Sequence, residues 1–251
     1  MAFNLYALPM MLGDQYILSS IIRETRDTVT FAGMQKDMRR EVLVETLRPE
    51  AMKDPDRLQD FLETARLQSR ILSKEVACTL ELIEAEGTWH LIKEKINGEP
   101  LDVMVSSGRK LPAIMICGLF LQLCHLCLFV EAHDLNARPL TLESVYLMDY
   151  NFRFDNLVCT GKRAQGATKQ MLSAIARELM PLLDMTSPCA SRMRELLNRV
   201  CYSRHWDVFI TMMLDEELVR MQMDIVDAEG EARLAQKKDE VADNTHRHFT
   251  S

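Results

Sequence analysis

Residues 111–130 read Leu111-Pro-Ala-Ile-Met-Ile-Cys-Gly-Leu-Phe-Leu-Gln-Leu-Cys-His-Leu-Cys-Leu-Phe-Val130, an apolar run without Asp, Glu, Lys or Arg. Two short strand-like pieces follow, Ser144-Val-Tyr-Leu-Met148 and Asn151-Phe-Arg-Phe-Asp-Asn-Leu157. Large apolar and polar side chains alternate in the second piece, as they do along a β-strand. This stretch predicts a long buried helix that leads into a β-hairpin ending near Asp155, and the rest of the chain is organised around it.

The apolar run at residues 111–130 has two interpretations. Its length is about that needed to cross a bilayer, so one alternative is a membrane-anchored adaptor that uses this run as its span. A fully buried core helix has the same hydropathy. Gln122, His125, the Leu-Pro start and the globular character of both flanks favour the core helix, and membrane attachment is not expected.

Composition limits the class of protein. A chain of 251 residues fits one large domain or two lobes. Its net charge of −7 argues against nucleic-acid binding, because phosphate contacts need clustered Lys and Arg. The seven Cys are odd in number and lie in apolar segments, which indicates reduced thiols. With no secretory leader visible at the start, we expect a cytoplasmic protein.

The segments before and after residues 111–157 differ in kind. After a lead-in at 1–15, residues 16–96 predict a small β-rich lobe of five strands and one helix. Residues 97–215 predict a second lobe that is mainly helical. A charged helix is expected at 216–238, followed by a tail at 239–251 with the composition of a disordered segment. The class is therefore α+β.

This order of elements, over residues 16–215, resembles the protein-kinase fold, with a reduced helical lobe. Asp155-Asn-Leu157 falls where the D-F-G motif of kinases belongs. Val42-Leu-Val-Glu-Thr-Leu-Arg-Pro49 is similar to the third strand of kinases, and Phe61-Leu-Glu-Thr-Ala65 to the regulatory helix. Leu91-Ile-Lys-Glu-Lys-Ile-Asn-Gly-Glu-Pro-Leu101 is similar to the hinge, and Ala132-His133 to the end of the long helix.

The departures from the kinase pattern fall on the catalytic positions. No glycine occurs in residues 23–28, where kinases cover the ATP phosphates with a glycine-rich loop. The resemblance places Glu45 at the phosphate-pairing Lys and Thr64 at its Glu partner. The catalytic loop becomes Arg138-Pro-Leu-Thr-Leu-Glu-Ser144, in which Thr141 is nearest to the base Asp. Asp155 alone remains as a metal ligand.

Lys93 falls at the gatekeeper position, which is usually uncharged in kinases and lines the nucleotide pocket. The resemblance thus assigns Lys93, Glu94 and Ile96 to a vestigial pocket and hinge. We hypothesise that Lys93 pairs with Glu45 and that the pair occupies the pocket in place of nucleotide. In the alternative, the strand alignment differs by one residue and both side chains point to solvent.

We therefore expect a catalytically inactive kinase-like domain, a pseudokinase, that acts as a scaffold or allosteric binder of another protein and needs no cofactor. One alternative is an atypical phosphotransfer enzyme that binds ATP and Mg²⁺ through Asp155. Cys124 and Cys127 have a metal-like spacing, but no second such pair exists, so free thiols are expected. The charged helix is expected to present a solvated face, and the alternative is that its apolar positions dock on a partner or on the helical lobe; these positions are Leu218, Met221, Met223, Ile225 and Val226.

Overall fold

The structure is a computed structural model that describes residues 8–137, 140–148, 151–160, 167–203 and 208–249. Internal contacts divide the chain into two units, Met1–Leu101 with His133–Ala167 and Asp102–Ala132 with Thr168–Ser251. The sequence placed the boundary between residues 96 and 97 and assigned the hairpin to the second lobe. The hairpin belongs to the first unit because the end of its second strand, Phe154, is hydrogen-bonded to Glu75 O and Ala77 N, in the segment that precedes the strand β5 (Thr79–Ala85).

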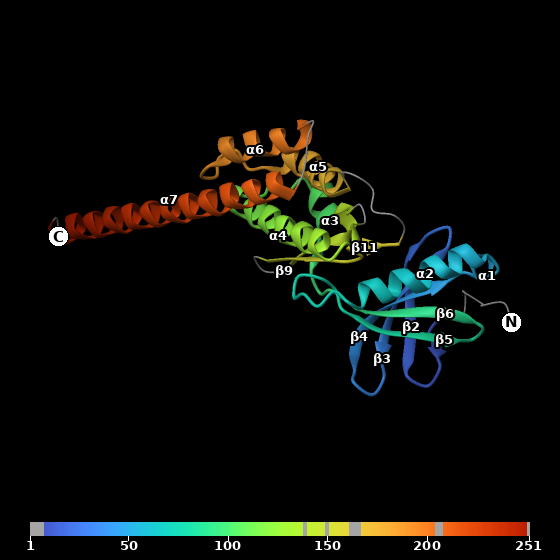
Figure 1. The fold of residues 1–251 in the computed structure, drawn as a ribbon. Coiled ribbons are helices and arrows are strands. Elements are labelled where there is room, and N and C mark those ends of the chain that lie inside the picture. The colour runs from blue at the N-terminus through green and yellow to red at the C-terminus, as the bar shows by residue number, and fades with distance from the viewer. Residues whose placement is uncertain (1–7, 138–139, 149–150, 161–166, 204–207, 250–251) are drawn as a thin grey trace. The chain divides into compact units, whose positions relative to one another are not determined.

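An antiparallel sheet forms most of the first unit (Figure 1). In the described residues its order is β1-β2-β3-β4-β6-β5. The strands are β1 (Met10–Leu12), β2 (Tyr16–Glu24), β3 (Thr28–Gln35), β4 (Arg40–Leu47), β5 (Thr79–Ala85) and β6 (Thr88–Glu94). Strand β1 was not predicted. It lies in the expected lead-in because Gly13, with φ of +54°, turns the chain so that residues 10–12 pair with residues 16–18.

Alternation along the strands separates two faces of this sheet. Alternate residues of β3, β4 and β6 build a hydrophobic core on one face, which includes Phe31, Val44 and Ile92. The intervening residues face the opposite side, and these include Glu45 on β4 and Lys93 on β6. The polar positions that the sequence singled out are thus carried on the face away from this core.

Helices α1 (Pro49–Met52) and α2 (Pro55–Gln68) follow β4. The Asp54 side chain caps α2 by accepting hydrogen bonds from the backbone N–H groups of Asp56 and Arg57, and Pro55 occupies the first turn. This confirms the predicted start of the helix. The described residues 16–96 hold two helices instead of the one expected, because Pro49 starts a single extra turn.

The predicted hairpin is present as β9 (Val145–Met148) and β10 (Asn151–Phe154), while its turn at 149–150 lies outside the described residues. Strand β9 also pairs with β7 (Glu99–Pro100), and β8 (Asn136–Ala137) pairs with β11 (Val158–Cys159). A 3₁₀ turn, η1 (Leu142–Ser144), precedes β9. Gly98 lies so close to β9 that a Cβ atom there would be 2.8 Å from the carbonyl oxygen of Leu147, so this turn requires glycine.

The second unit is helical. It contains most of α3 (Leu101–Ser106) and α5 (Ala167–Leu179), and all of α4 (Ala113–Ala132), η2 (Met180–Leu182), α6 (Ala190–Tyr202) and α7 (Val208–Phe249). Helix α4 is at its centre and packs against α6 and α7. Eleven of the 20 residues of α4 are buried. Within the described chain, α4 is the one helix whose length and composition would suit a membrane span, and here it supplies the core of the helical unit.

Helix α7 differs from the prediction. The sequence suggested that the second lobe ends at residue 215, a separate charged helix covers 216–238 and a disordered tail begins at 239. Instead one helix runs from Val208 to Phe249. Its sequence contains no proline, and the single glycine, Gly230, costs a helix only about 1 kcal/mol relative to alanine. Figure 1 shows the C-terminal part of α7 extending past the ends of α4 and α6.

Candidate functional site

A buried cluster of charged side chains surrounds Lys93, which is 1% exposed. Its Nζ atom lies 3.0 and 3.2 Å from the two carboxylate oxygens of Asp155 and 2.9 Å from Oδ1 of Asn156. The same Nζ is 3.4 Å from Oε2 of Glu45. The hypothesised ion pair of Lys93 with Glu45 is therefore present, and Lys93 forms a second ion pair with Asp155.

The strand pairing explains why Glu45 and Lys93 meet. In the pairing of β4 with β6, Leu43 is opposite Lys93 and Glu45 is opposite Leu91. Glu45 and Lys93 are thus diagonal neighbours on one face, within reach of long side chains. Thr28 on β3 donates a hydrogen bond of 3.1 Å to the other oxygen of Glu45 and holds that carboxylate in place.

Asp155 reaches the cluster from the end of the hairpin, immediately after β10. Its backbone N–H donates to Ser144 O at 2.9 Å, and the preceding Phe154 N–H donates to Glu75 O at 2.7 Å. These backbone bonds attach the end of β10 both to η1 and to the segment before β5. The position of the Asp155 carboxylate is therefore set by the tertiary structure around the hairpin.

Two residues of the cluster, Asn156 and Gln68, were missed by the sequence prediction. Asn156 donates to Oδ2 of Asp155 at 2.8 Å, while its own Oδ1 accepts from Lys93 and, at 3.3 Å, from Nε2 of Gln68. Gln68 is the last residue of α2. Asn156 has φ of +57°, a conformation that Asn tolerates better than most residues. An Asn two residues after the end of a strand was the one signal that marked this position.

The electrostatics of the cluster favour a charged lysine. Burial by itself lowers the pKa of Lys93, but the neighbouring carboxylates of Asp155 and Glu45 raise it, and the resulting pKa is above its ordinary value. Lys93 therefore carries its proton at neutral pH. The carboxylates also accept hydrogen bonds from Thr28 and Asn156, and Arg23 is a second cation near enough to lower the pKa of Lys93 slightly.

The two other predicted pocket residues lie next to the cluster in the chain. Glu94 forms an ion pair with Arg153, at 2.5 Å for Nη1 with Oε1 and 2.8 Å for Nη2 with Oε2. Hydrogen bonds from this guanidinium hold the pKa of Glu94 below its ordinary value. Ile96 is buried. This strand end is thus fixed to β10 by the Glu94–Arg153 pair.

The remaining predicted positions make no hydrogen bond or ion pair with the cluster in the described part of the chain. Thr64 is half-buried on α2, and this helix reaches the cluster one turn later, through Gln68. Thr141 is exposed, with its hydroxyl 3.3 Å from that of Ser144. Residues 138–139, the start of the predicted catalytic-loop segment, lie outside the described residues. The described residues contain no group of three or more His, Cys, Asp or Glu side chains placed to hold a metal ion.

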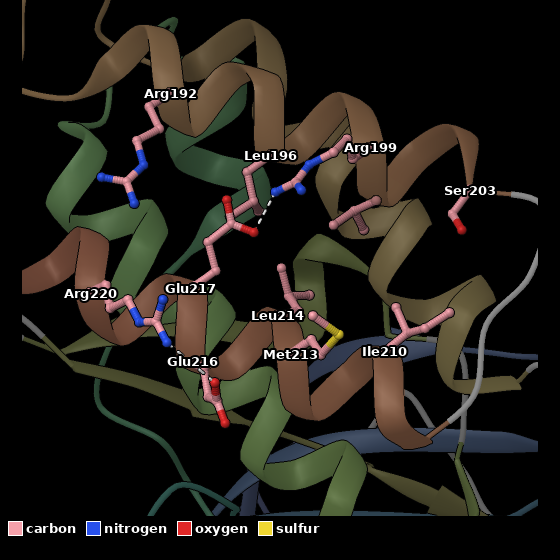
Figure 2. Close-up of a pocket in the computed structure, with 11 residues that line it drawn as sticks. Arg192, Leu196, Arg199, Ser203, Ile210, Met213, Leu214, Glu216, Glu217 and Arg220 are labelled. Atoms are coloured by element: carbon pink, nitrogen blue, oxygen red, sulfur yellow. Dashed lines mark hydrogen bonds and ion pairs between the residues drawn. The ribbon is translucent and has the colours of Figure 1, made fainter.

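The helical unit has a separate concave feature, a cavity of about 560 Å³ between α6 and α7 (Figure 2). Apolar side chains line one end, including Leu196, Met213 and Leu214. Charged side chains line the other end, where Arg199 is 2.5 Å from Glu217 and Figure 2 shows this pair bridging the two helices. The arginines at the cavity are thus engaged by acidic residues of α7.

Comparison with known proteins places the fold. No family model and no curated protein matches the sequence. The kinase domain of Mycobacterium tuberculosis PknI matches the structure with a TM-score of 0.60 and 12% identity, covering 84% of this chain and 99% of that one. A cysteine-to-alanine mutant of the same domain gives a TM-score of 0.61 at 11% identity, with 85% and 98% covered.

The chain therefore has a two-lobed, α+β protein-kinase-like fold, with a β-rich lobe and a mainly helical lobe. This confirms the fold class expected from the sequence. At such low identity the similarity concerns the fold alone. What the chain does must be argued from its own residues.

Proposed function

We propose that this chain is a kinase-like binding module without phosphotransfer activity, a pseudokinase that works in the cytoplasm by binding another protein. The observation that carries the proposal is the buried contact of Lys93 with Asp155, Asn156 and Glu45. In this arrangement the single lysine of the cluster and the D-F-G-like aspartate are bound to each other.

Lys93 is engaged by buried partners. A lysine ammonium has three N–H donors and no acceptor. Here Nζ donates to Asp155 and Asn156 and forms an ion pair with Glu45 at 3.4 Å. A phosphate oxygen would have to displace one of these buried partners. In addition, Glu45 occupies the position of the phosphate-pairing lysine, and its negative charge repels phosphate.

The residues do not fit Mg²⁺. A magnesium site in kinases uses the D-F-G Asp and the catalytic-loop Asn together with phosphate oxygens. The Asp155 carboxylate is 3.0 Å from the Lys93 ammonium, which would repel a metal ion bound at the same oxygens. The segment at 138–144 contains neither Asn nor Asp.

A thermal-shift titration of the full chain with ATP, alone and with Mg²⁺ or Mn²⁺, tests the proposal. A ligand that binds only the folded state must raise the melting temperature. We expect no shift at millimolar nucleotide and no transfer of labelled γ-phosphate to the chain or to a generic protein substrate. A metal-dependent shift that disappears in Asp155→Ala would overturn the proposal.

The second candidate is an atypical nucleotide-binding enzyme. One observation favours it: Lys93 on β6 is in contact with Asp155, so the chain has a lysine beside the D-F-G-like aspartate even though the resemblance places Glu45 on β4 where kinases have their phosphate-pairing lysine. In this interpretation Lys93 takes over phosphate contacts from a different strand. Lys93→Met would then abolish nucleotide binding, whereas under the leading proposal wild type and variant alike give no nucleotide-dependent shift.

A membrane-anchored adaptor is the third interpretation, and the burial of α4 argues against it. Eleven of its residues are covered by protein, and Cys117 donates a hydrogen bond to a backbone carbonyl of α7 at Leu218. If α4 were inserted in a bilayer, α7 would lose the apolar side chains of α4 against which it packs. We expect the chain in the soluble fraction without detergent, and recovery only in detergent extracts would favour the anchor.

A further inference from the structure

Helix α7 carries two apolar faces, and the structure covers one of them. Leu214, Leu218, Met221 and Ile225 are buried in the helical unit, where α7 packs against α4. A second set of apolar residues stays exposed, with 41% to 63% of each residue accessible to solvent. We call this set the outer stripe: Met212, Val219, Met223 and Val226.

The outer stripe has the geometry of a docking face. Its members are separated by seven, four and three residues, which places them on one side of an α-helix. The stripe spans about four turns, roughly 21 Å at 1.5 Å per residue. Two of its members are methionines, whose flexible thioethers adapt to a partner's shape. Gly230, four residues after Val226, would continue the stripe and has no heavy atom within 4 Å of an added Cβ.

Charge on α7 indicates what kind of partner fits. Four acidic residues near the body of the unit are already paired: Asp215 with His125, Glu216 with Arg220, Glu217 with Arg199 and Asp224 with Arg192. The next three acidic residues, Asp227, Glu229 and Glu231, have no ion pair or hydrogen bond with any described residue. Among the residues whose side chains are described, the stripe therefore ends beside three carboxylates without a partner, and Arg233 follows them.

We infer that the outer stripe is the docking surface for a basic amphipathic helix of another protein. Apolar side chains at i, i+3, i+4 and i+7 of that helix would cover the stripe, and its Lys or Arg residues would pair with Asp227, Glu229 and Glu231. This inference rests on the proposed binding function and names the chemistry of the partner.

Two other occupants fit the charge less well. A second copy of the chain would place its own acidic turn near this one if the two helices paired in parallel. A lipid surface attracts amphipathic helices through Lys and Arg on their polar face, whereas this face is acidic. Both are outcomes that the experiment below separates from the basic helix.

The probe is a fluorescent 18-residue peptide of Leu and Lys, with Leu at helical i, i+3, i+4 and i+7 spacing, titrated with the full chain and followed by anisotropy. An otherwise identical peptide with Glu in place of Lys is the charge control. We expect the Lys peptide to bind at least about tenfold more tightly than the Glu peptide in low salt, and the preference to shrink as salt is added.

Variants separate the apolar and charged parts of the surface. Replacing all four stripe residues by Gln keeps helix propensity and should weaken peptide binding at least about tenfold. The triple change Asp227→Asn, Glu229→Gln and Glu231→Gln should reduce the salt dependence. Met38→Gln with Met185→Gln removes exposed methionines elsewhere and should leave binding unchanged. Gly230→Leu extends the stripe and should tighten binding.

Equal affinity for the Lys and Glu peptides, or unchanged binding by the four-Gln variant, would overturn the inference. So would self-association of the wild type that the four-Gln variant loses, or binding to vesicles of phosphatidylcholine and phosphatidylserine that it loses. Circular dichroism must show that each variant keeps its helix content. Nucleotide binding is measured in a separate assay. If the chain proved to be an active enzyme, the proposed function would be refuted, but the peptide-binding result would still stand or fail by itself.

Discussion

Removing the Lys93 ammonium should destabilise the β-rich unit strongly. In Lys93→Met the buried carboxylates of Asp155 and Glu45 lose their cation while their side chains remain only 8% and 14% exposed. Breaking a buried ion pair by removing one partner costs about 3–5 kcal/mol. Because domains are stable by only about 5–15 kcal/mol, this is a large fraction of the total.

Urea unfolding followed by tryptophan fluorescence measures this loss. Trp89 lies on β6, four residues from Lys93, and a Trp206→Phe background leaves it as the only tryptophan. With a slope of about 2–3 kcal/mol/M, a loss of 3–5 kcal/mol lowers the midpoint by about 1–2 M. The pKa of Lys93 is raised in the folded state, so its contribution is complete below the ordinary lysine pKa and is lost only at more alkaline pH. The difference between wild type and variant should therefore hold from about pH 6 to pH 9.

Two matched variants make the test specific. Lys95→Met, two residues along, breaks an exposed pair with Glu41 at 2.8 Å and should cost less than about 1 kcal/mol. Adding Asp155→Asn and Glu45→Gln to Lys93→Met should recover more than half of the loss, because no uncompensated charge then stays buried. A midpoint for Lys93→Met equal to that of Lys95→Met would refute the reasoning.

Three further predictions address the rest of the chain. Gly98→Ala should cost about 1–3 kcal/mol in urea unfolding, since its Cβ would be 2.8 Å from the carbonyl oxygen of Leu147; an unchanged midpoint would contradict this close approach. Burial and a hydrogen bond to an acidic side chain raise the pKa of Tyr16 to about 12, above an unfolded value of about 10, so stability should fall as pH rises between these values; Tyr16→Phe should lessen that alkaline fall in melting temperature. Cys78 is exposed while burial raises the pKa of Cys127, so a thiol reagent should modify Cys78 first and Cys127 only after unfolding; rapid modification of Cys127 in the native chain would contradict its burial.

Local chemistry was sufficient to predict several parts of the structure. The start of α2 was predictable because Asp54 and Pro55 act within one helical turn. The central helix was predictable because a long uncharged apolar run between globular segments is expected to be buried in the core of the protein. The pairing of Glu45 with Lys93 was different: it was a hypothesis from the kinase resemblance with a solvent-facing alternative, and the strand register decided it, because diagonal neighbours on adjacent strands share a face.

The sequence by itself thus determined most of the elements, their order and hence the kinase-like class, but not β1, α1 or the length of α7. Tertiary structure decided the partners of Lys93. Asp155 and Asn156 lie 62 and 63 residues further along the chain, and Gln68 joins the cluster through Asn156, so these residues meet only where β10 and α2 are packed against the sheet. It also decided which apolar face of α7 is covered. Helical periodicity shows that apolar residues share a side, but only packing against α4 distinguishes the buried Leu218 from the exposed Met223.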